Sequence, residues 1–253
     1  MEQDCANYLA GTYVELGRKA ATENDGKALE KYVSELQELH DAIIKLGRIT
    51  VNKKVILLLG RLYHLQARKE EAKKCFRDHV GTCLELLSDE DPSNDYQAYM
   101  GLGESLGRLY DDENALAAWS MIGPRNRSTD DPRDRYEGMT SKPSGPLYYR
   151  CANGECDHIW RFANDIYVCR DCIDCMFCEK CHTELKTGRM EWRVCGKDHE
   201  FLYVPKWDSE AAEKVEKGHV KVGNDPAMKI ADWVDKLRRE YGIEVPEDGA
   251  GST

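Results

Sequence analysis

A chain of 253 residues is long enough to bury a hydrophobic core without disulfides, and its formal net charge of −10 argues against general attraction to nucleic acids or anionic membranes. Hydrophobic residues make up 41% and charged residues 32% of the chain, as in water-soluble proteins with a large polar surface. The longest apolar run, Val55–Leu59, is far too short to span a bilayer. The sequence starts without a basic and apolar leader, so we expect an intracellular protein, cytoplasmic or nuclear, that contacts neither membrane nor nucleic acid directly.

Residues 1–127 are predicted to form a helical domain, because strand signals are absent and apolar residues recur three and four positions apart. Gly60 and Ala72 are small where two antiparallel helices would cross closely. Tyr63 and Phe76 would fill the space beside them. The same offsets recur at Leu102, Gly103, Leu106, Ala115 and Trp119, and a weaker earlier copy contains Leu16, Gly17, Ala28 and Tyr32. Successive alanines of the three copies are 44 and then 43 residues apart.

This pattern, Leu-Gly-x-x-Tyr followed by Ala-x-x-x-Phe, resembles the tetratricopeptide repeat, whose usual period is about 34 residues. The resemblance implies a mainly helical fold of stacked helix pairs. It also implies a groove, lined by the first helix of each pair, that binds an extended peptide or a partner helix. The alternative is an ordinary helical bundle in which the small residues agree by accident.

Residues 128–146 are predicted to be a linker, because prolines, glycines and charges of mixed sign interrupt the helical pattern. The boundary between two domains is expected in this stretch.

The segment 147–207 is rich in metal ligands, and eight of the eleven cysteines lie between Cys151 and Cys195. Two Cys-x-x-Cys knuckles are each able to place two sulfurs on one metal, but neither fills a tetrahedral shell alone. With the flanking pairs they give four pairs of soft ligands: Cys151/Cys156, Cys169/Cys172, Cys178/Cys181 and Cys195/His199. Eight such ligands predict two structural zinc ions.

The spacing from Tyr167 through the two knuckles resembles the ZZ-type zinc finger, which binds two zinc ions in a cross-brace. The resemblance implies that alternate pairs share a metal. One zinc would then be held by Cys151, Cys156, Cys178 and Cys181, and the other by Cys169, Cys172, Cys195 and His199. His182 is the competing ligand for the place given to Cys195, and Cys175 is left without a metal.

In some ZZ fingers an Asp-Tyr-Asp stretch binds a peptide N-terminus. Here Asp174 remains, Asp171 lies nearby, and Cys175 and Met176 replace the Tyr and the second Asp. The resemblance thus implies an amine-binding pocket formed by Asp171 and Asp174.

Residues 208–245 are predicted to form a C-terminal docking region. A short exposed helix is expected over residues 208–217, and an edge strand around Val220. A last helix is expected from Asp225 as N-cap to Gly242, with an apolar stripe that packs on the zinc module or the helical array. Residues 246–253 are predicted to be a disordered tail.

The order of repeats, cysteine module and Trp-containing last helix resembles fungal tetratricopeptide-repeat proteins with a C-terminal ZZ-like module. No Walker loop, Gly-x-Ser-x-Gly or His-Glu-x-x-His motif is present, so no enzymatic activity is predicted. We expect a zinc-binding adaptor for a protein or peptide partner. The alternatives are a component of a ubiquitin ligase and a purely structural zinc cap on the helical array. The oligomeric state and the partner's identity stay open.

Overall fold

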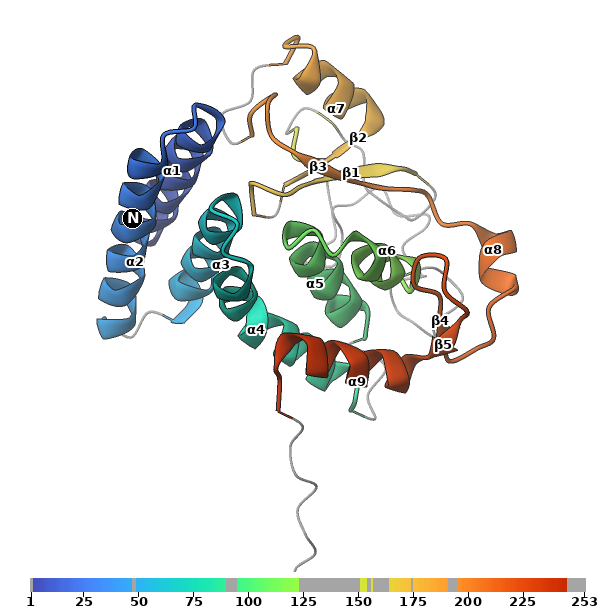
Figure 1. Ribbon diagram of the computed structural model, residues 1–253. Helices are drawn as coiled ribbons and strands as arrows, with labels where there is room; N and C mark the ends of the chain where they lie inside the picture. The colour runs from blue at the N-terminus through green and yellow to red at the C-terminus, as the bar shows by residue number, and fades with distance from the viewer. Residues whose placement is uncertain are drawn as a thin grey trace, which may run out of the picture.

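The computed structural model describes residues 2–46, 49–89, 95–122, 151–153, 156, 164–173, 175–190 and 195–244. Within these residues the chain is mainly helical (Figure 1). A helical array is followed by a small sheet with one helix on its outer side, and the last helix returns to pack along the array. The expected linker at 128–146 and the expected tail at 246–253 lie outside the described residues.

The array consists of three helix pairs that stack in sequence order. The pairs are α1 (Glu2–Thr22) with α2 (Gly26–Lys45), α3 (Ile49–Leu65) with α4 (Lys69–Leu86), and α5 (Asp95–Arg108) with α6 (Asp112–Ser120). Each pair turns through a residue in the left-handed conformation, at Asn24, Ala67 and Tyr110, with φ of 56°, 58° and 61°. These three turns follow one another at intervals of 43 residues, so the chain repeats one helix-turn-helix unit.

The helices of a pair cross closely at glycine. A Cβ atom at Gly60 would lie 2.6 Å from Cε2 of Phe76, and one at Gly103 would lie 2.5 Å from Nε1 of Trp119. Gly17 precedes Gly60 by the same 43 residues that separate Gly60 from Gly103. The sequence pattern of glycines therefore marks real helix crossings.

The first copy of the repeat differs by one residue from the sequence-based assignment. The N–H of Leu29 donates to the carbonyl of Asp25 at the start of α2, as the N–H of Ala72 does to Arg68 at the start of α4. Leu29 and Val33 are buried, whereas Ala28 and Tyr32 are only partly buried. The assignment of Ala28 and Tyr32 is thus wrong by one position. Ala28 matches the alanines of the other copies in residue type, but Leu29 occupies the position of Ala72 relative to the turn.

The cysteine-rich segment forms an antiparallel sheet in the order β2-β1-β3. Its strands are β1 (Ile166–Cys169), β2 (Met176–Cys178) and β3 (Phe201–Val204), and α7 (Glu179–Lys186) follows β2 directly. Side chains alternate between the two faces of a strand. One face, with Ile166, Val168, Met176, Leu202 and Val204, belongs to the same hydrophobic core as the helical array. The other carries Phe177 and Phe201 toward Leu185 of α7 and the cysteines, so the sheet lies between the array and α7 (Figure 1).

The C-terminal region packs on the array rather than on the metal ligands. It contains α8 (Ser209–Glu213), the hairpin of β4 (His219–Val220) with β5 (Met228–Lys229), and α9 (Ile230–Tyr241). Helix α9 lies along α4, and the indole N–H of Trp233 donates to Asn114 Oδ1 at 2.8 Å. The expected start at Asp225 is wrong, because Met228 and Lys229 pair with β4 before the helix begins. Its end at Gly242, with φ of 62°, agrees with the left-handed helix stop that glycine favours.

None of the helices in the described part of the chain is both long enough and apolar enough to cross a membrane.

Replacing Gly60 with alanine tests the close helix crossing. The added Cβ would lie 2.6 Å from the Phe76 ring and 2.9 Å from the Cβ of Cys75, so we expect a loss of about 1–3 kcal/mol in the free energy of unfolding. Gly11 is the control, because it also lies inside a helix but is exposed, and a Cβ there meets nothing within 4 Å. Gly11→Ala should gain up to about 1 kcal/mol. Urea unfolding of both variants measures this, and equal stabilities would disprove the close crossing.

Candidate metal centre

Two groups of four soft ligands form around the sheet. Within each group the ligand atoms all lie within 4.8 Å of one another. The first group contains Cys151, Cys156, Cys178 and Cys181, and the second contains Cys169, Cys172, Cys195 and His199. These are the two quartets that the ZZ resemblance implied, and in chain order their ligand pairs alternate between the groups.

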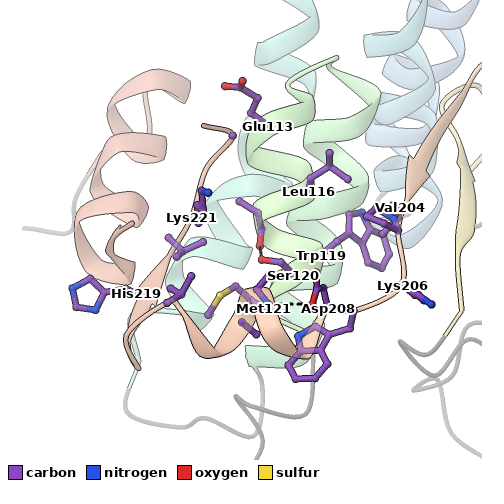
Figure 2. A pocket seen from close by; sticks show the side chains of 18 of the residues that line it. Glu113, Leu116, Trp119, Ser120, Met121, Val204, Lys206, Asp208, His219 and Lys221 are labelled. Carbon is purple, nitrogen blue, oxygen red and sulfur yellow. Dashed lines mark hydrogen bonds between the residues drawn. The ribbon is translucent and has the colours of Figure 1, made fainter. Parts of the chain in front are cut away.

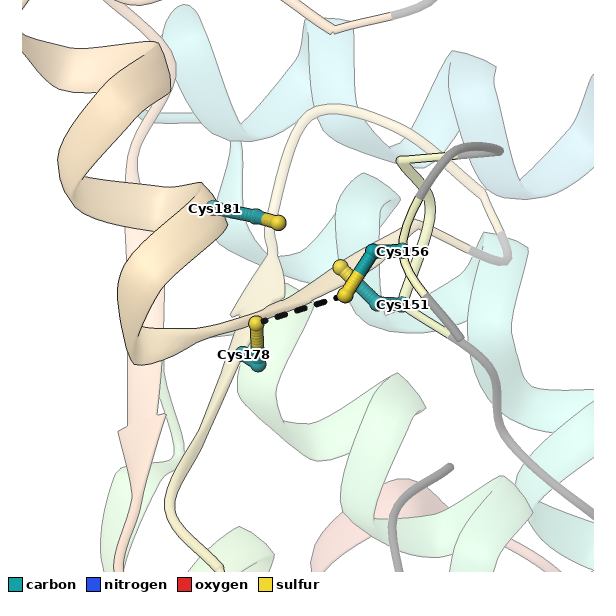
Figure 3. A group of neighbouring side chains, drawn as sticks. All are labelled: Cys151, Cys156, Cys178 and Cys181. Atoms are coloured by element: carbon teal, nitrogen blue, oxygen red, sulfur yellow. Dashed lines mark hydrogen bonds between the residues drawn. The ribbon is translucent and has the colours of Figure 1, made fainter. Parts of the chain in front are cut away.

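Strand pairing places the two groups at opposite ends of β1. Cys178 at the end of β2 lies opposite Ile166 at the start of β1, whereas Cys169 at the end of β1 lies opposite Phe201. The first group is completed by Cys181 in the first turn of α7 and by the loop that carries Cys151 and Cys156 (Figure 3). An antiparallel sheet therefore separates two knuckles that are only five residues apart in sequence.

The distances between ligand atoms fit tetrahedral coordination. Bonds of about 2.3 Å from zinc to sulfur and about 2.0 Å to nitrogen put two sulfurs about 3.8 Å apart, and a sulfur and a nitrogen about 3.5 Å apart. The sulfurs of Cys195 and Cys169 are 3.7 Å apart, and those of Cys156 and Cys178 are 3.9 Å apart. Nδ1 of His199 lies 3.5, 3.3 and 3.5 Å from the sulfurs of Cys169, Cys172 and Cys195.

These contacts are too long for disulfides, whose sulfurs are about 2.05 Å apart, and the cysteines are free thiols. Each group could therefore hold one metal ion, with four protein ligands and no position left for substrate. Thiolate and imidazole donors in a four-coordinate shell suit zinc.

His182 and Cys175 are both close to the ligands but lie outside the two groups. The ring of His182 stacks on Tyr167 with centroids 3.9 Å apart and meets the edge of Phe201. Burial, and then the charge of Lys186, lowers the pKa of His182. Cys175 is buried beside the thiols of Cys172 and Cys195, and its carbonyl accepts the N–H of Cys169. Cys195, not His182, thus completes the second group.

Asp171 lies in a different environment from the one expected. Its Oδ1 accepts from Nε of Arg61 at 2.7 Å, and its Oδ2 accepts from the N–H of Glu200 at 2.9 Å. Both side chains of the ion pair are buried, with 2% and 1% of Arg61 and Asp171 exposed. Contrary to the expectation, Asp171 therefore offers no carboxylate to a peptide amine in this structure. Asp174 lies outside the described residues.

The cysteine-rich segment covers the side of α1, α3 and α5 formed by Glu15, Arg18, Arg61 and Arg108, which we call the first-helix face. Nε2 of His199 lies 2.9 Å from Glu15 Oε2. The guanidinium of Arg108 donates to the carbonyl of Cys172 at 2.9 Å. The first-helix face, where the repeat resemblance implied a partner-binding groove, thus contacts the chain's own cysteine-rich segment. Sequence reasoning missed these contacts because each joins residues more than sixty positions apart.

Tyr110 lies at the edge of this contact, with 37% of its surface exposed. Its hydroxyl accepts from Arg61 at 2.9 Å, and its ring lies under the guanidinium of Arg170 at 4.3 Å. The ring of His64 stacks on the ring of Tyr110, with the two centroids 4.3 Å apart. Burial, followed by the charge of Arg61, lowers the pKa of His64 to about 4. His64 is therefore neutral at physiological pH and packs as an aromatic ring.

A separate cavity of about 390 Å³ lies between α6, the segment after β3, α8 and β4 (Figure 2). Its walls are mainly apolar, and charged side chains of both signs line it as well. The lining includes Leu116, Trp119, Met121, Val204, Trp207, Ala212, Val215 and Val220, together with Glu113, Lys206, Asp208 and Lys221. No sequence motif pointed to it, because its walls come from segments about ninety residues apart.

Comparisons of the chain with protein-family models, with curated proteins and with solved structures found no match in any of the three.

The two groups predict the metal content of single-cysteine variants. Native mass spectrometry of the wild type should find two zinc ions per chain. Cys178→Ser removes a ligand of the first group and should reduce the count to one, because three ligands bind zinc much more weakly. Cys175→Ser is the matched control and should retain two. One or no zinc in the wild type, or loss of zinc from Cys175→Ser, would contradict this ligand assignment.

The buried ion pair predicts a structural role for Asp171. Asp171→Ala removes the buried carboxylate that pairs with Arg61 at 2.7 Å and leaves only the exposed Glu200 at 3.6 Å, so we expect a loss of about 3–5 kcal/mol in the free energy of unfolding. The double variant Arg61→Met/Asp171→Leu should lose less. Asp235→Ala breaks an exposed ion pair with Arg238 and should cost under about 1 kcal/mol. If Asp171→Ala costs no more than Asp235→Ala in urea unfolding, the structural role is wrong.

Proposed function

We propose that this chain is a zinc-binding, non-enzymatic adaptor whose tetratricopeptide-like helix pairs and ZZ-like cysteine module together bind a protein or peptide partner. The observation that carries the proposal is the alternation of the two ligand groups, each with four protein donors. A closed shell of protein ligands is typical of structural zinc, whereas catalytic zinc keeps a position for water or substrate.

The cross-brace arrangement supports the ZZ-like assignment. Ligand pairs one and three form one group, and pairs two and four form the other, as in the ZZ family. The period of 43 residues supports the repeat assignment less directly, because it exceeds the usual period of about 34. Both assignments concern how the partner-binding surfaces are built, not which partner binds.

The adaptor's binding surface is better placed at the cavity beside α6 than at the first-helix face. The first-helix face already contacts the cysteine-rich segment through Glu15, Arg61 and Arg108. The cavity is concave and mainly apolar, and it contains the indoles of Trp119 and Trp207. Such a site fits a bulky apolar side chain of a peptide, with the charged lining residues binding the peptide's polar neighbours.

A purely structural zinc module is the second candidate function. The residues between the ligands of one knuckle, Arg170 and Asp171, both form ion pairs with the helical array, through Asp112 and Arg61. This observation favours a module whose main task is to hold the array together. A ubiquitin-ligase component is the third candidate, in which the cross-brace would recruit a conjugating enzyme.

Peptide binding distinguishes the adaptor from the structural module. A randomised peptide array probed with the zinc-loaded chain should select peptides that share a bulky apolar residue. Leu116→Glu replaces an apolar part of the cavity wall with a carboxylate and should weaken that binding at least about tenfold, since a bound apolar side chain would then desolvate a charged group. Leu46→Glu is the control, because Leu46 is 69% exposed at the end of α2, away from the cavity.

Three results would contradict the adaptor. Equal weakening by both glutamate variants, or no selected peptide, would favour the structural module. Zinc-dependent discharge of ubiquitin from charged conjugating enzymes would favour the ligase component.

A further inference from the structure

The second metal group extends beyond the cysteine-rich segment, through its histidine. His199 directs Nδ1 at the three sulfurs, and its other ring nitrogen, Nε2, lies 2.9 Å from Oε2 of Glu15 in α1. The two residues are 184 positions apart in the sequence. His199 is buried, with 6% of its surface exposed, so this contact is the histidine's connection to the array.

Glu15 is itself held in place. Arg18, one turn further along α1, donates from its NH2 group to Oε1 of Glu15 at 2.7 Å and from Nε to Oε2 at 3.2 Å. The same guanidinium also reaches the carbonyl of Asp198 at 3.5 Å, next to the histidine. These two hydrogen bonds from Arg18 orient the Glu15 carboxylate toward the ring of His199.

A neutral histidine binds a metal through the nitrogen that carries no hydrogen, so its other nitrogen must carry the hydrogen. If Nδ1 binds the metal, Nε2–H has to donate to an acceptor. Glu15 Oε2 lies at donor–acceptor distance for this bond. Outer partners of this kind set the tautomer and orientation of a metal-bound histidine and raise its basicity as a ligand.

We propose that Glu15 is a positioning residue of the second metal site, which couples metal binding at that site to the docking of the first helix pair. The inference rests on the proposed binding of two zinc ions. The first group differs in that its contacts lie within the cysteine-rich segment. Cys178 and Cys181 come from β2 and α7, and the Cys181 sulfur accepts from Asn153 of the same segment. Coupling between two sites is reciprocal, so metal at the second site also strengthens the contact of α1 with the cysteine-rich segment.

Zinc affinity of the full chain tests the positioning role. In competition with a chromophoric chelator, Glu15→Ala and Glu15→Gln should each weaken one of the two zinc sites by about 10–100-fold and leave the other unchanged. Glu23→Ala is the matched control, because Glu23 directly follows the last residue of α1 and its carboxylate forms an exposed ion pair with Lys19. It should retain both wild-type affinities.

Hydrogen exchange tests the reciprocal effect. Cys172→Ser disables the second site and should lower the protection of amides in α1, whereas Cys181→Ser disables the first site and should leave α1 at wild-type protection. Glu15→Gln should lower the protection of α1 amides even with zinc bound, because the charged contact between Glu15 and His199 is lost.

The inference is overturned if both zinc affinities of the Glu15 variants equal those of wild type, or if both fall by the same factor. It is also overturned if Cys172→Ser and Cys181→Ser change α1 protection equally. A wild-type chain that binds no zinc would instead refute the proposed function, so the two failures are distinguishable.

Discussion

The knuckle formed by Cys169 and Cys172 joins the two halves of the molecule, because its four residues face in two directions. The two cysteines face the second metal group, while the residues between them, Arg170 and Asp171, face the helical array. Arg170 pairs with both carboxylate oxygens of Asp112 at 2.7 and 2.9 Å, and also donates to the carbonyl of Gly107. Buried charges of this kind are tolerated only when each is paired and hydrogen-bonded, so the knuckle and the array require each other in one geometry.

The array and the sheet of the metal-binding segment therefore pack directly against each other. Ile166, Val168 and Leu202 belong to the same hydrophobic core as the helices. Gly107 of α5 allows the sheet to approach closely, since a Cβ there would lie 2.9 Å from Leu202 Cδ2. Zinc in such a protein would support more than a small finger, because loss of ligand geometry would also expose part of the helical core. The first-helix face contacts the cysteine-rich segment, so we place the proposed partner site at the cavity beside α6.

Several features could be predicted from sequence because they depend on short-range patterns. The helical character of the array follows from apolar spacing, and the close crossings at Gly60 and Gly103 follow from residue size beside Phe76 and Trp119. The prediction was wrong where a contact between residues distant in sequence overrode a local start signal for a helix. Pairing of Met228 with Val220 moved the start of the last helix beyond Asp225, although Asp-Pro is a strong local start signal.

The sequence by itself determined which residues can hold metal, because soft ligands at short fixed spacings have few other physical uses. Resemblance to a known cross-brace was enough to divide them into the two quartets that the sheet brings together. Only the tertiary structure decided what surrounds those ligands. Asp171 became half of a buried ion pair with Arg61, and Glu15 became the partner of His199. Such contacts join residues 110 and 184 positions apart, and no local pattern encodes which distant side chain a buried charge or ring will meet.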